Sequence, residues 1–438
     1  MACKTSVSVV LALTLVANTL PTVFGQRSSS PQPKVLWKVS TGGNITTRPL
    51  LKGKKIFVTS SDNNFYAIST DNGAHVWNIN GLQPGTTPTI SKDGLSMFVN
   101  NYFIDVNNGM YTSLVSVNLD NGRQNWKYGG DPVGNQTNGE RVQQMGPAVL
   151  CADTGTLYST STYYNPVFPN ASLNGVFPID PDTGVPSGPA IQPPKYSVDP
   201  TWSWLPQVAI TLSSDCTTIY GRSSGKLQGN SNPSLINMSA VNIKTGQVLW
   251  VANNTDFAGC LSKSSIPVTL NPNNDHVYVV ESDLGYSGCS GYFTTNTIYA
   301  YYAQTGILAW QYIGGIIPYN SVAFNAQPAL SPDGAALFAS HGDGNVYALN
   351  ATDGQVLWSF RCAGVPSATP AVTSDGSTVI ITTGGGSVHG VHAANGTEAW
   401  TYFTGSGIAA GVTLNDDDSV AYFGNDNGYI FALAISSC

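Results

Sequence analysis

Charged residues are scarce in this sequence of 438 residues, because Asp, Glu, Lys and Arg together make up only 10% of it. Lys and Arg number 18 against 25 acidic residues, so the formal net charge is −7. No stretch gathers several basic residues together. Nucleic-acid binding depends on Lys and Arg side chains that neutralise phosphates. We therefore expect no nucleic-acid partner.

Helical patterning and two cysteine spacings are also missing. Beyond residue 25, no long window repeats apolar residues with the period of a helix, which argues against amphipathic surface helices. The sequence has no Cys-x-x-Cys and no two adjacent cysteines. Structural zinc sites and covalently attached haem commonly use the first spacing, so neither is expected.

What the sequence does contain is a repeated hairpin. In residues 345–358 a short apolar run precedes the turn pair Asp353-Gly354, and a second run ends at Trp358. Glycine takes a positive φ without steric cost, so this pattern predicts a β-hairpin. The same spacing of Gly and Trp recurs at Gly73/Trp77, Gly122/Trp126, Gly246/Trp250, Gly306/Trp310, Gly354/Trp358 and Gly396/Trp400.

One copy departs from the pattern. Asp180 to Gly184 keeps the turn, but Gly188 stands where a Trp is expected. We expect a looser outer strand in this third unit. In most units a small residue, such as Ala348, lies six positions before the turn glycine, which suggests that a neighbouring sheet approaches closely. Repetition at roughly 40–60 residues indicates a propeller or a solenoid.

Seven complete units and a split one account for the chain. The last unit, residues 411–434, supplies three strands and lacks the Trp-bearing fourth. Residues 35–38 at the other end, Val-Leu-Trp-Lys, look like the end of a unit without its beginning. Closing a ring with this strand removes the exposed sheet edges of an open array. We expect residues 35–39 to pair with residues 429–434.

The pattern Val346-Tyr347-Ala348-Leu349-x4-Gly354-x3-Trp358 resembles the repeat of the quinoprotein-dehydrogenase-like propellers, also called the PQQ-like repeat. The resemblance implies an all-β fold, an eight-bladed β-propeller of four-stranded antiparallel blades, over residues 35–438. It also implies that the repeat tryptophan docks between neighbouring blades. That role is carried over to Trp37, Trp77, Trp126, Trp250, Trp310, Trp358 and Trp400.

The family leaves the activity open. Its dehydrogenases hold a quinone and a calcium or lanthanide ion through Glu, Asn and Asp ligands, often with a pair of adjacent cysteines over the cofactor. This sequence has no such pair, and the acidic ligands map onto no position. Other relatives, such as the outer-membrane assembly lipoprotein, bind proteins instead, and a fold alone does not give function. We predict no cofactor and no metal, with pyrroloquinoline quinone (PQQ) and calcium as the alternative.

The N-terminus is typical of a signal peptide. Lys4 precedes an apolar stretch at residues 7–17, and Val23-Phe24-Gly25 offers a cleavage site. Residues 1–25 are interpreted as the signal peptide, and residues 26–34 as a short leader. The apolar stretch is short for a membrane span, although a signal anchor is the alternative. We expect a secreted protein without a membrane span after cleavage.

Six cysteines come after the cleavage site, and an even number in a secreted chain suggests disulfides. The blade layout places Cys260 near Cys289, and Cys151 near Cys216. Cys362 and Cys438 fall on opposite faces, so either of them could be free. Asn-x-Ser/Thr sequons, some of which could arise by chance, stand at Asn44, Asn135, Asn170, Asn237, Asn253, Asn350 and Asn395.

Long connections lie on one face of the predicted ring. They are residues 129–146, 162–175, 186–206, 221–235, 282–296 and 314–327. Long loops commonly carry function, and Arg141 and Arg222 are expected to give this set charge. Its aromatic residues include Tyr163, Tyr164, Trp202, Trp204, Tyr286, Tyr319 and Phe324. They could form a platform for a protein or a glycan, or pack on one another as a small core.

Two functions therefore remain open: a non-catalytic binding module, which we favour, and a PQQ-dependent dehydrogenase of alcohols or sugars with divergent ligands. Two smaller motifs have simpler interpretations. His389 takes the position of Tyr347 in the seventh unit and is expected to pack in its place. The run Asn415 to Asp418 corresponds to a turn in the sixth unit and is expected to be a solvated turn rather than a calcium site.

Overall fold

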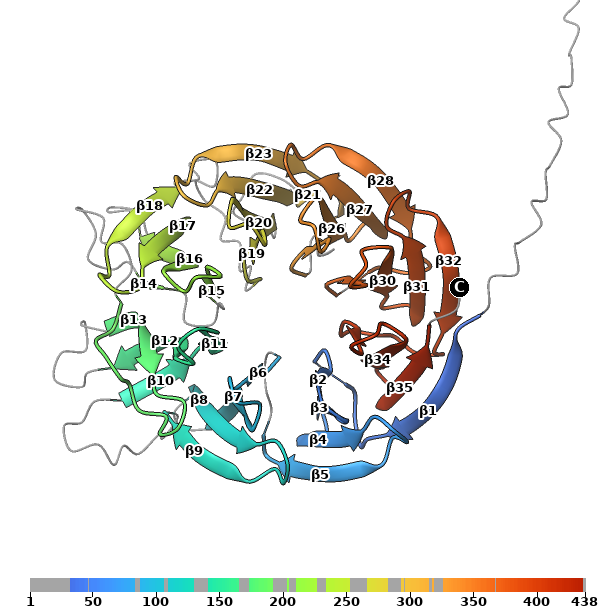
Figure 1. The fold of residues 1–438 in the computed structure, drawn as a ribbon, viewed down its shortest axis with the longest axis horizontal. Helices are drawn as coiled ribbons and strands as arrows, with labels where there is room; N and C mark the ends of the chain where they lie inside the picture. Colours follow the sequence, from blue (N-terminus) through green and yellow to red (C-terminus); the bar gives the residue numbers. More distant parts are fainter. Residues whose placement is uncertain are drawn as a thin grey trace, which may run out of the picture.

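A computed structural model describes residues 32–435, with gaps at residues 46, 83–86, 106–108, 130–140, 165–172, 192–202, 205–209, 227–233, 253–265, 283–292, 295, 315–316, 319–325 and 367. Every regular element in these ranges is a β-strand. The strands form eight antiparallel sheets around a ring, seen face-on in Figure 1. The all-β, eight-bladed propeller is thus confirmed. Within the ranges described, no helix is long and apolar enough to cross a membrane.

Six blades have four strands, which are named below from the inner to the outer strand. Blade one contains β2 (Leu50–Lys52), β3 (Lys55–Ser60), β4 (Asn64–Ser69) and β5 (His75–Asn80). Blade two contains β6 (Thr89–Ile90), β7 (Ser96–Asp105), β8 (Gly109–Asn118) and β9 (Gln124–Tyr128). Blade five contains β19 (Thr269–Leu270), β20 (His276–Ser282), β22 (Asn296–Tyr302) and β23 (Leu308–Ile313). Blade six contains β25 (Ala329–Leu330), β26 (Ala336–Ser340), β27 (Asn345–Asn350) and β28 (Val356–Arg361). Blade seven contains β29 (Ala371–Val372), β30 (Thr378–Thr382), β31 (Ser387–His392) and β32 (Glu398–Phe403). Blade eight contains β33 (Thr413–Leu414), β34 (Val420–Gly424), β35 (Tyr429–Ala434) and β1 (Lys34–Ser40).

Blades three and four carry additional strands. Blade three contains β10 (Arg141–Met145), β11 (Val149–Leu150), β12 (Leu157–Tyr164) and β13 (Leu173–Ile179). Blade four contains β14 (Ser203–Trp204), β15 (Thr211–Leu212), β16 (Thr218–Lys226), β17 (Ser234–Asn242) and β18 (Val248–Ala252). A separate pair, β21 (Phe293–Thr294) and β24 (Ile317–Pro318), lies outside the blades.

The two ends of the described chain close the ring. The strand β1 pairs antiparallel with β35, from Lys34 opposite Ala434 to Ser40 opposite Tyr429. In Figure 1 the blue β1 lies along the outer side of the red β35. The predicted pairing of residues 35–39 with the last blade is therefore confirmed.

The repeated turn fixes how each third strand joins the fourth. Gly354 has a φ of 73°, and its N–H donates to the Asn350 carbonyl at 2.9 Å. A residue with a Cβ is strained at such a φ. A register shift between Ala348 and Leu349 then turns the outer strand, and Ala348 is fully buried. The turn glycine and the small residue are thus both required by the geometry of the backbone.

Six of the seven repeat tryptophans pack on the turn of the following blade, as the family resemblance implied, whereas Trp400 does not, because no hairpin turn follows β35. A Cβ added to Gly354 would lie within 3.0 Å of the Trp310 ring, and the Trp310 indole N–H donates to the carbonyl of Ala351, three residues before that glycine. The indole N–H groups that donate in this way belong to Trp37, Trp77, Trp126, Trp250, Trp310 and Trp358.

Blade three is the exception, and the prediction drawn from Gly188 is confirmed. After β13 the described chain makes only isolated bridges, Val176 to Ile191 and Ile179 to Pro186, where other blades have a fourth strand. Because this blade offers no tryptophan, a Cβ on Gly246 of blade four would meet nothing within 4 Å. The junction of blades three and four therefore lacks the docking contact made elsewhere.

Candidate functional site

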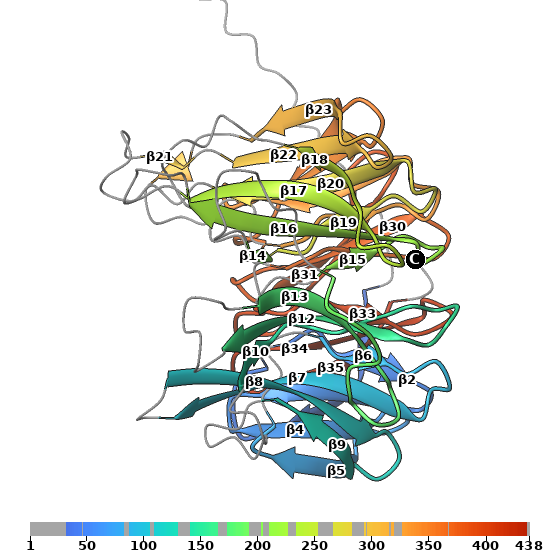
Figure 2. The ribbon, with the colours of Figure 1, turned by 90° about the vertical axis from the view of Figure 1, so that its left-hand side faces the viewer.

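The ring has two faces with different connections, seen from the side in Figure 2. We call the side with the turns between second and third strands the hairpin face, and the side with the turns between first and second strands the turn face. The predicted long connections belong to the hairpin face.

The hairpin face is asymmetric in the length of its strands. β7 and β8 of blade two are 10 residues each, and β16 and β17 of blade four are 9 each. The corresponding β26 and β30 of blades six and seven are 5 residues each. The longer hairpins extend beyond the short ones, as the left side of Figure 2 shows.

Extra inner strands line two of these extended hairpins. In blade three β10 pairs with the far end of β12, with Arg141 opposite Tyr164 and Val142 opposite Tyr163. In blade four β14 pairs with the far part of β16, with Trp204 opposite Ser223. The backbone therefore places Tyr163, Tyr164 and Trp204 on the part of the hairpin face that extends furthest in these blades. Residues 162–164 and 221–226, which we expected to be loop, are strand.

The remaining predicted site residues, Trp202, Tyr286, Tyr319 and Phe324, lie outside the described ranges. Pro318, which precedes Tyr319 in the sequence, lies in β24. This strand pairs with β21, and Phe293 lies opposite Pro318. A short sheet thus joins the hairpin of blade five to the connection that comes after this blade.

Arg222 does not supply surface charge, contrary to expectation. Its side chain is buried, with 2% exposed, and Nη2 donates to the carbonyl of Val280 in blade five. Burying an arginine requires such partners. This residue therefore links two blades and is removed from the predicted ligand surface.

The short turns of the hairpin face hold a polar motif that sequence reasoning missed. In blade six the Tyr347 hydroxyl donates to Asp343 Oδ2 at 2.6 Å, and His341 Nδ1 lies 3.0 Å from Asp343 Oδ1. Blade one repeats the pair, with the Tyr66 hydroxyl 2.6 Å from Asp62 Oδ2. The spacing Asp-x-x-x-Tyr in both blades could have revealed it.

These networks shift the pKa values of their members. Burial alone would raise the pKa of Asp343, but hydrogen bonds from Tyr347 and Asn345 outweigh it and hold the pKa below its usual value. Burial and the bond to Asp343 raise the pKa of Tyr347 to about 12. The pair thus stays as carboxylate and phenol at neutral pH, each satisfying the other, and is built for structure rather than proton transfer.

Cys362 and His389 lie close together beneath the same face. Cys362 is free and buried, and burial raises the pKa of its thiol to about 12. His389 Nδ1 lies 2.7 Å from Glu398 Oε1, while Nε2 accepts from the Ala363 N–H at 3.3 Å. His389 is 3% exposed, so it does pack in the place of Tyr347. A thiol protonated at neutral pH is a poor nucleophile.

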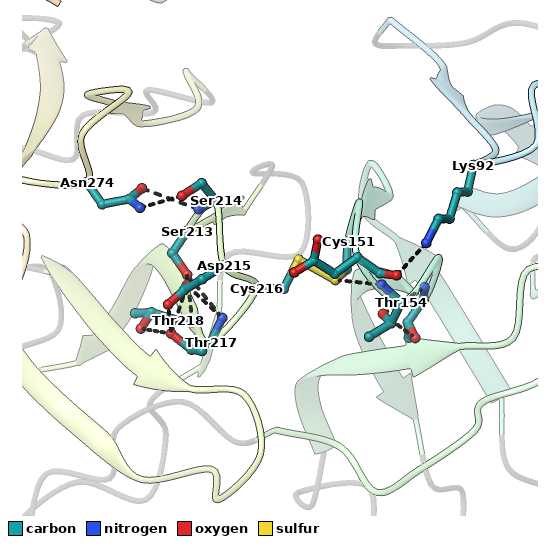
Figure 3. The surroundings of a disulfide bond; sticks show 12 residues. Lys92, Cys151, Thr154, Ser213, Ser214, Asp215, Cys216, Thr217, Thr218 and Asn274 are labelled. Atoms are coloured by element: carbon teal, nitrogen blue, oxygen red, sulfur yellow. Dashed lines mark hydrogen bonds between the residues drawn. A yellow bond between two sulfur atoms is a disulfide. The ribbon is translucent and has the colours of Figure 1, made fainter.

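The turn face carries contacts that tie neighbouring blades together (Figure 3). Cys151 of blade three and Cys216 of blade four form a disulfide with a Cα–Cα distance of 5.7 Å, and this is a predicted pair. On one side Lys92 of blade two donates to the Asp153 carbonyl. On the other, Asn274 of blade five donates to Ser214 Oγ at 2.5 Å. Cys260, Cys289 and Cys438 lie outside the described ranges.

The sequons differ in accessibility. Asn44 and Asn395 are exposed, and Asn350 is partly buried at the end of β27. Asn237 lies in β17, opposite Ser223. Asn135, Asn170 and Asn253 fall in the gaps between the described ranges.

The described residues can be searched for ligands of a metal ion. Within those ranges no group of three His, Cys, Asp or Glu side chains could hold a metal ion. The disulfide joins cysteines 65 residues apart on the turn face, not an adjacent pair.

Comparison with known proteins places this geometry in a family. A family model described as "Outer membrane protein assembly factor BamB" matches residues 28–175 and 294–437. The chain belongs to this family of PQQ-like repeat propellers. No curated protein sequence is significantly similar to it.

Two solved structures show the same fold at low sequence identity. BamB from Moraxella catarrhalis is 15% identical, with a TM-score of 0.53, over 92% of this chain and 100% of that one. The quinohemoprotein alcohol dehydrogenase from Comamonas testosteroni is 12% identical, with a TM-score of 0.63, over 93% of this chain and 77% of that one. The ring thus has the same fold as both of these structures.

Proposed function

We propose that this protein is a secreted, glycosylated propeller that binds a protein or a glycan through the long connections of blades three to six on the hairpin face. One observation carries the proposal: β10 and β14 build out blades three and four, while the opposite blades end in short turns. A nearly symmetric ring needs such an asymmetry to recognise one ligand. A site that combines extra strands with aromatic residues suits partners with extended surfaces.

The relatives support a binding role without fixing the partner. The matching family is named for an assembly factor of the outer membrane, which describes a protein that works on other proteins. In our chain Tyr347 and Asp343 bond to each other in the short turn of blade six, and the Cys362 thiol stays protonated. These features favour binding over catalysis.

The test begins with a glycan array and a pull-down using the purified protein, followed by Trp204→Ala. Loss of a large aromatic anchor commonly costs about 2 kcal/mol or more, roughly thirtyfold in affinity. We expect that loss with little change in melting temperature. Trp358→Ala is the control, since Trp358 packs on Gly396, and it should lower stability and leave the affinity of the folded protein unchanged. A Trp204→Ala protein that melts much earlier and binds normally would refute the site.

A PQQ-dependent dehydrogenase is the second candidate, because the likeness to the alcohol dehydrogenase extends over 93% of the chain. No group of three His, Cys, Asp or Glu side chains among the described residues identifies a metal site for it. Reconstitution with PQQ and calcium, followed by dye reduction with alcohols and sugars, tests it. Activity above that of the untreated protein would favour this alternative over the binding module.

Secretion and glycosylation are tested on the protein made in a eukaryotic host. We expect the chain to begin after residue 25 and to lose mass when N-glycans are removed enzymatically. The exposed Asn395 offers the clearest single site, so Asn395→Gln should remove one glycan. An intact residue 1 and an unchanged mass would overturn both statements.

A further inference from the structure

The junction of blades seven and eight contains a pocket on the turn face. Its volume is about 290 Å³, close to the lower end for ligand pockets. It is lined by Trp400 and Ile435, by the turn of blade seven at Ser374 and Asp375, and by the turn of blade eight at Asp417 and Asp418. The site lies across the ring from the β10 and β14 extensions and is independent of the proposed function.

The pocket arises from the way the ring closes. At six other junctions the docking tryptophan is covered by the hairpin turn of the next blade, and its indole N–H donates to a carbonyl three residues before the turn glycine. In blade eight the strand beside β35 is β1, from the other end of the chain. No hairpin turn therefore joins β35 to its outer neighbour, and Trp400 loses this cover.

Trp400 shows the consequence. Its side chain is 3% exposed, yet its N–H donates to no residue in the described ranges. The residue at the place of the usual acceptor is Ile435, directly after β35, as Ala393 comes directly after β31 and accepts from Trp358 at 2.7 Å. Both Trp400 and Ile435 line the pocket. The Nε1 atom itself is open to the pocket rather than sealed in the core, so it can donate to an acceptor of a ligand, such as a peptide carbonyl.

The rest of the lining selects for positive charge. The carboxylates of Asp375, Asp417 and Asp418 line the pocket with one histidine, His392, and no Lys or Arg does. Asp375 accepts from Thr373 and Ser377, and Asp418 accepts from the Ser374 N–H and hydroxyl at 2.6 Å. These bonds hold each carboxylate in place through one of its two oxygens, Oδ1 of Asp375 and Oδ2 of Asp418. The second oxygen of each is left available to a ligand. An aromatic ring beside carboxylates is a favourable environment for a guanidinium group.

We propose that this pocket binds an arginine residue of a peptide. The peptide carbonyl accepts a hydrogen bond from the N–H of Trp400, as a turn carbonyl does at the six other junctions. The guanidinium group forms ion pairs with Asp375 and Asp417. A neutral ligand of the same shape gains only the first contact.

Isothermal titration of the full protein with acetyl-arginine amide tests the proposal, and acetyl-citrulline amide is the neutral match. We expect citrulline to bind at least tenfold more weakly, and the arginine probe to weaken at high salt. Asp375→Asn and Asp417→Asn should each reduce arginine binding about fivefold or more. Each asparagine keeps the side-chain oxygen that accepts from a backbone N–H of its turn. Asp333→Asn, in the equivalent turn of blade six, is the control and should change nothing.

Trp400→Phe tests the indole contact, because it keeps a ring and removes the N–H. It should weaken both probes alike, while Trp204→Ala should weaken neither. Equal binding of arginine and citrulline, binding unaffected by both aspartate changes, or binding of methyl glucoside in place of arginine would overturn the proposal.

Discussion

At the scale of single residues, the same amino acid at the same repeat position can have different neighbours. Trp358 donates its N–H to Ala393 at 2.7 Å, whereas Trp400 makes no such bond within the described ranges. Both side chains are at most 9% exposed. The position in the repeat therefore determines that the tryptophan is buried. Whether its N–H has an acceptor depends on the turn that follows the third strand of the next blade.

This difference predicts unequal effects of Trp→Phe. Trp358→Phe leaves the Ala393 carbonyl without its donor and should lower the free energy of unfolding by about 1–3 kcal/mol beyond the loss of ring size. Trp400→Phe loses only ring size. Urea unfolding of the two variants measures the difference, and equal losses would show that Trp400 has a partner.

The tyrosine–aspartate pairs predict an alkaline weakness. The pKa of Tyr347 rises from 10.0 to about 12 in the folded protein, so folding favours the protonated phenol. Its contribution is fully present below pH 10 and is lost as the pH rises toward 12. The melting temperature should fall over this range, and Tyr347→Phe should reduce the fall. Replacement of the exposed Tyr302 is the control; an equal effect there would refute the assignment.

Sequence reasoning reached residues that the repeat constrains and missed those that it does not. The turn glycines, the docking tryptophans and His389 could be assigned from their position within the unit. Arg222 was misjudged, because a charged residue in a polar run gives no sign that a neighbouring blade covers it. Of the aromatic residues expected on the hairpin face, the structure places Tyr163, Tyr164 and Trp204, and it places them through the pairing of their backbone.

At the scale of elements, one turn position serves to join blades. Cys216, Asn274 and Asp418 all have a positive φ of 55–56° at the place where other first turns have glycine. Each reaches the preceding blade, at Cys151, Ser214 and Ser374 respectively. A side chain at this position is strained, and the contact offsets the strain.

The disulfide stands at the junction that lacks a docking tryptophan. Cys151 and Cys216 join blades three and four, where Gly246 has no ring over it. A crosslink that closes a loop of 65 residues contributes about 4 kcal/mol by the chain-entropy estimate.

We expect Cys151→Ser with Cys216→Gly to lower the midpoint of urea unfolding accordingly. Part of the loss is recovered, because glycine suits the φ of 55° at position 216. Cys362→Ala is the control for the removal of a cysteine, since Cys362 forms no disulfide. If the double variant unfolds with the parent protein, the disulfide does not stabilise this junction.

At the scale of the whole molecule, the ring was predictable because the unit recurs and because the incomplete unit at each end of the chain supplies the strands that the other lacks. The extensions that make it asymmetric were less so. β10 and β14 are short strands without a repeat counterpart, and their pairing depends on partners distant in the sequence. The function that we propose depends on that asymmetry, so the fold could be inferred further than the site.

Ring closure gives the last prediction. β1 covers the outer edge of β35, and Trp37 packs on Gly73 and donates to Thr70, so one strand joins blade eight to blade one. Deleting residues 26–40 exposes the β35 edge and removes a large aromatic contact, commonly worth about 3–5 kcal/mol. We expect a large fall in melting temperature and self-association. Deleting residues 26–31 alone keeps β1 and should change neither. A protein without residues 26–40 that is secreted and melts like its parent would show that the ring does not depend on this closure.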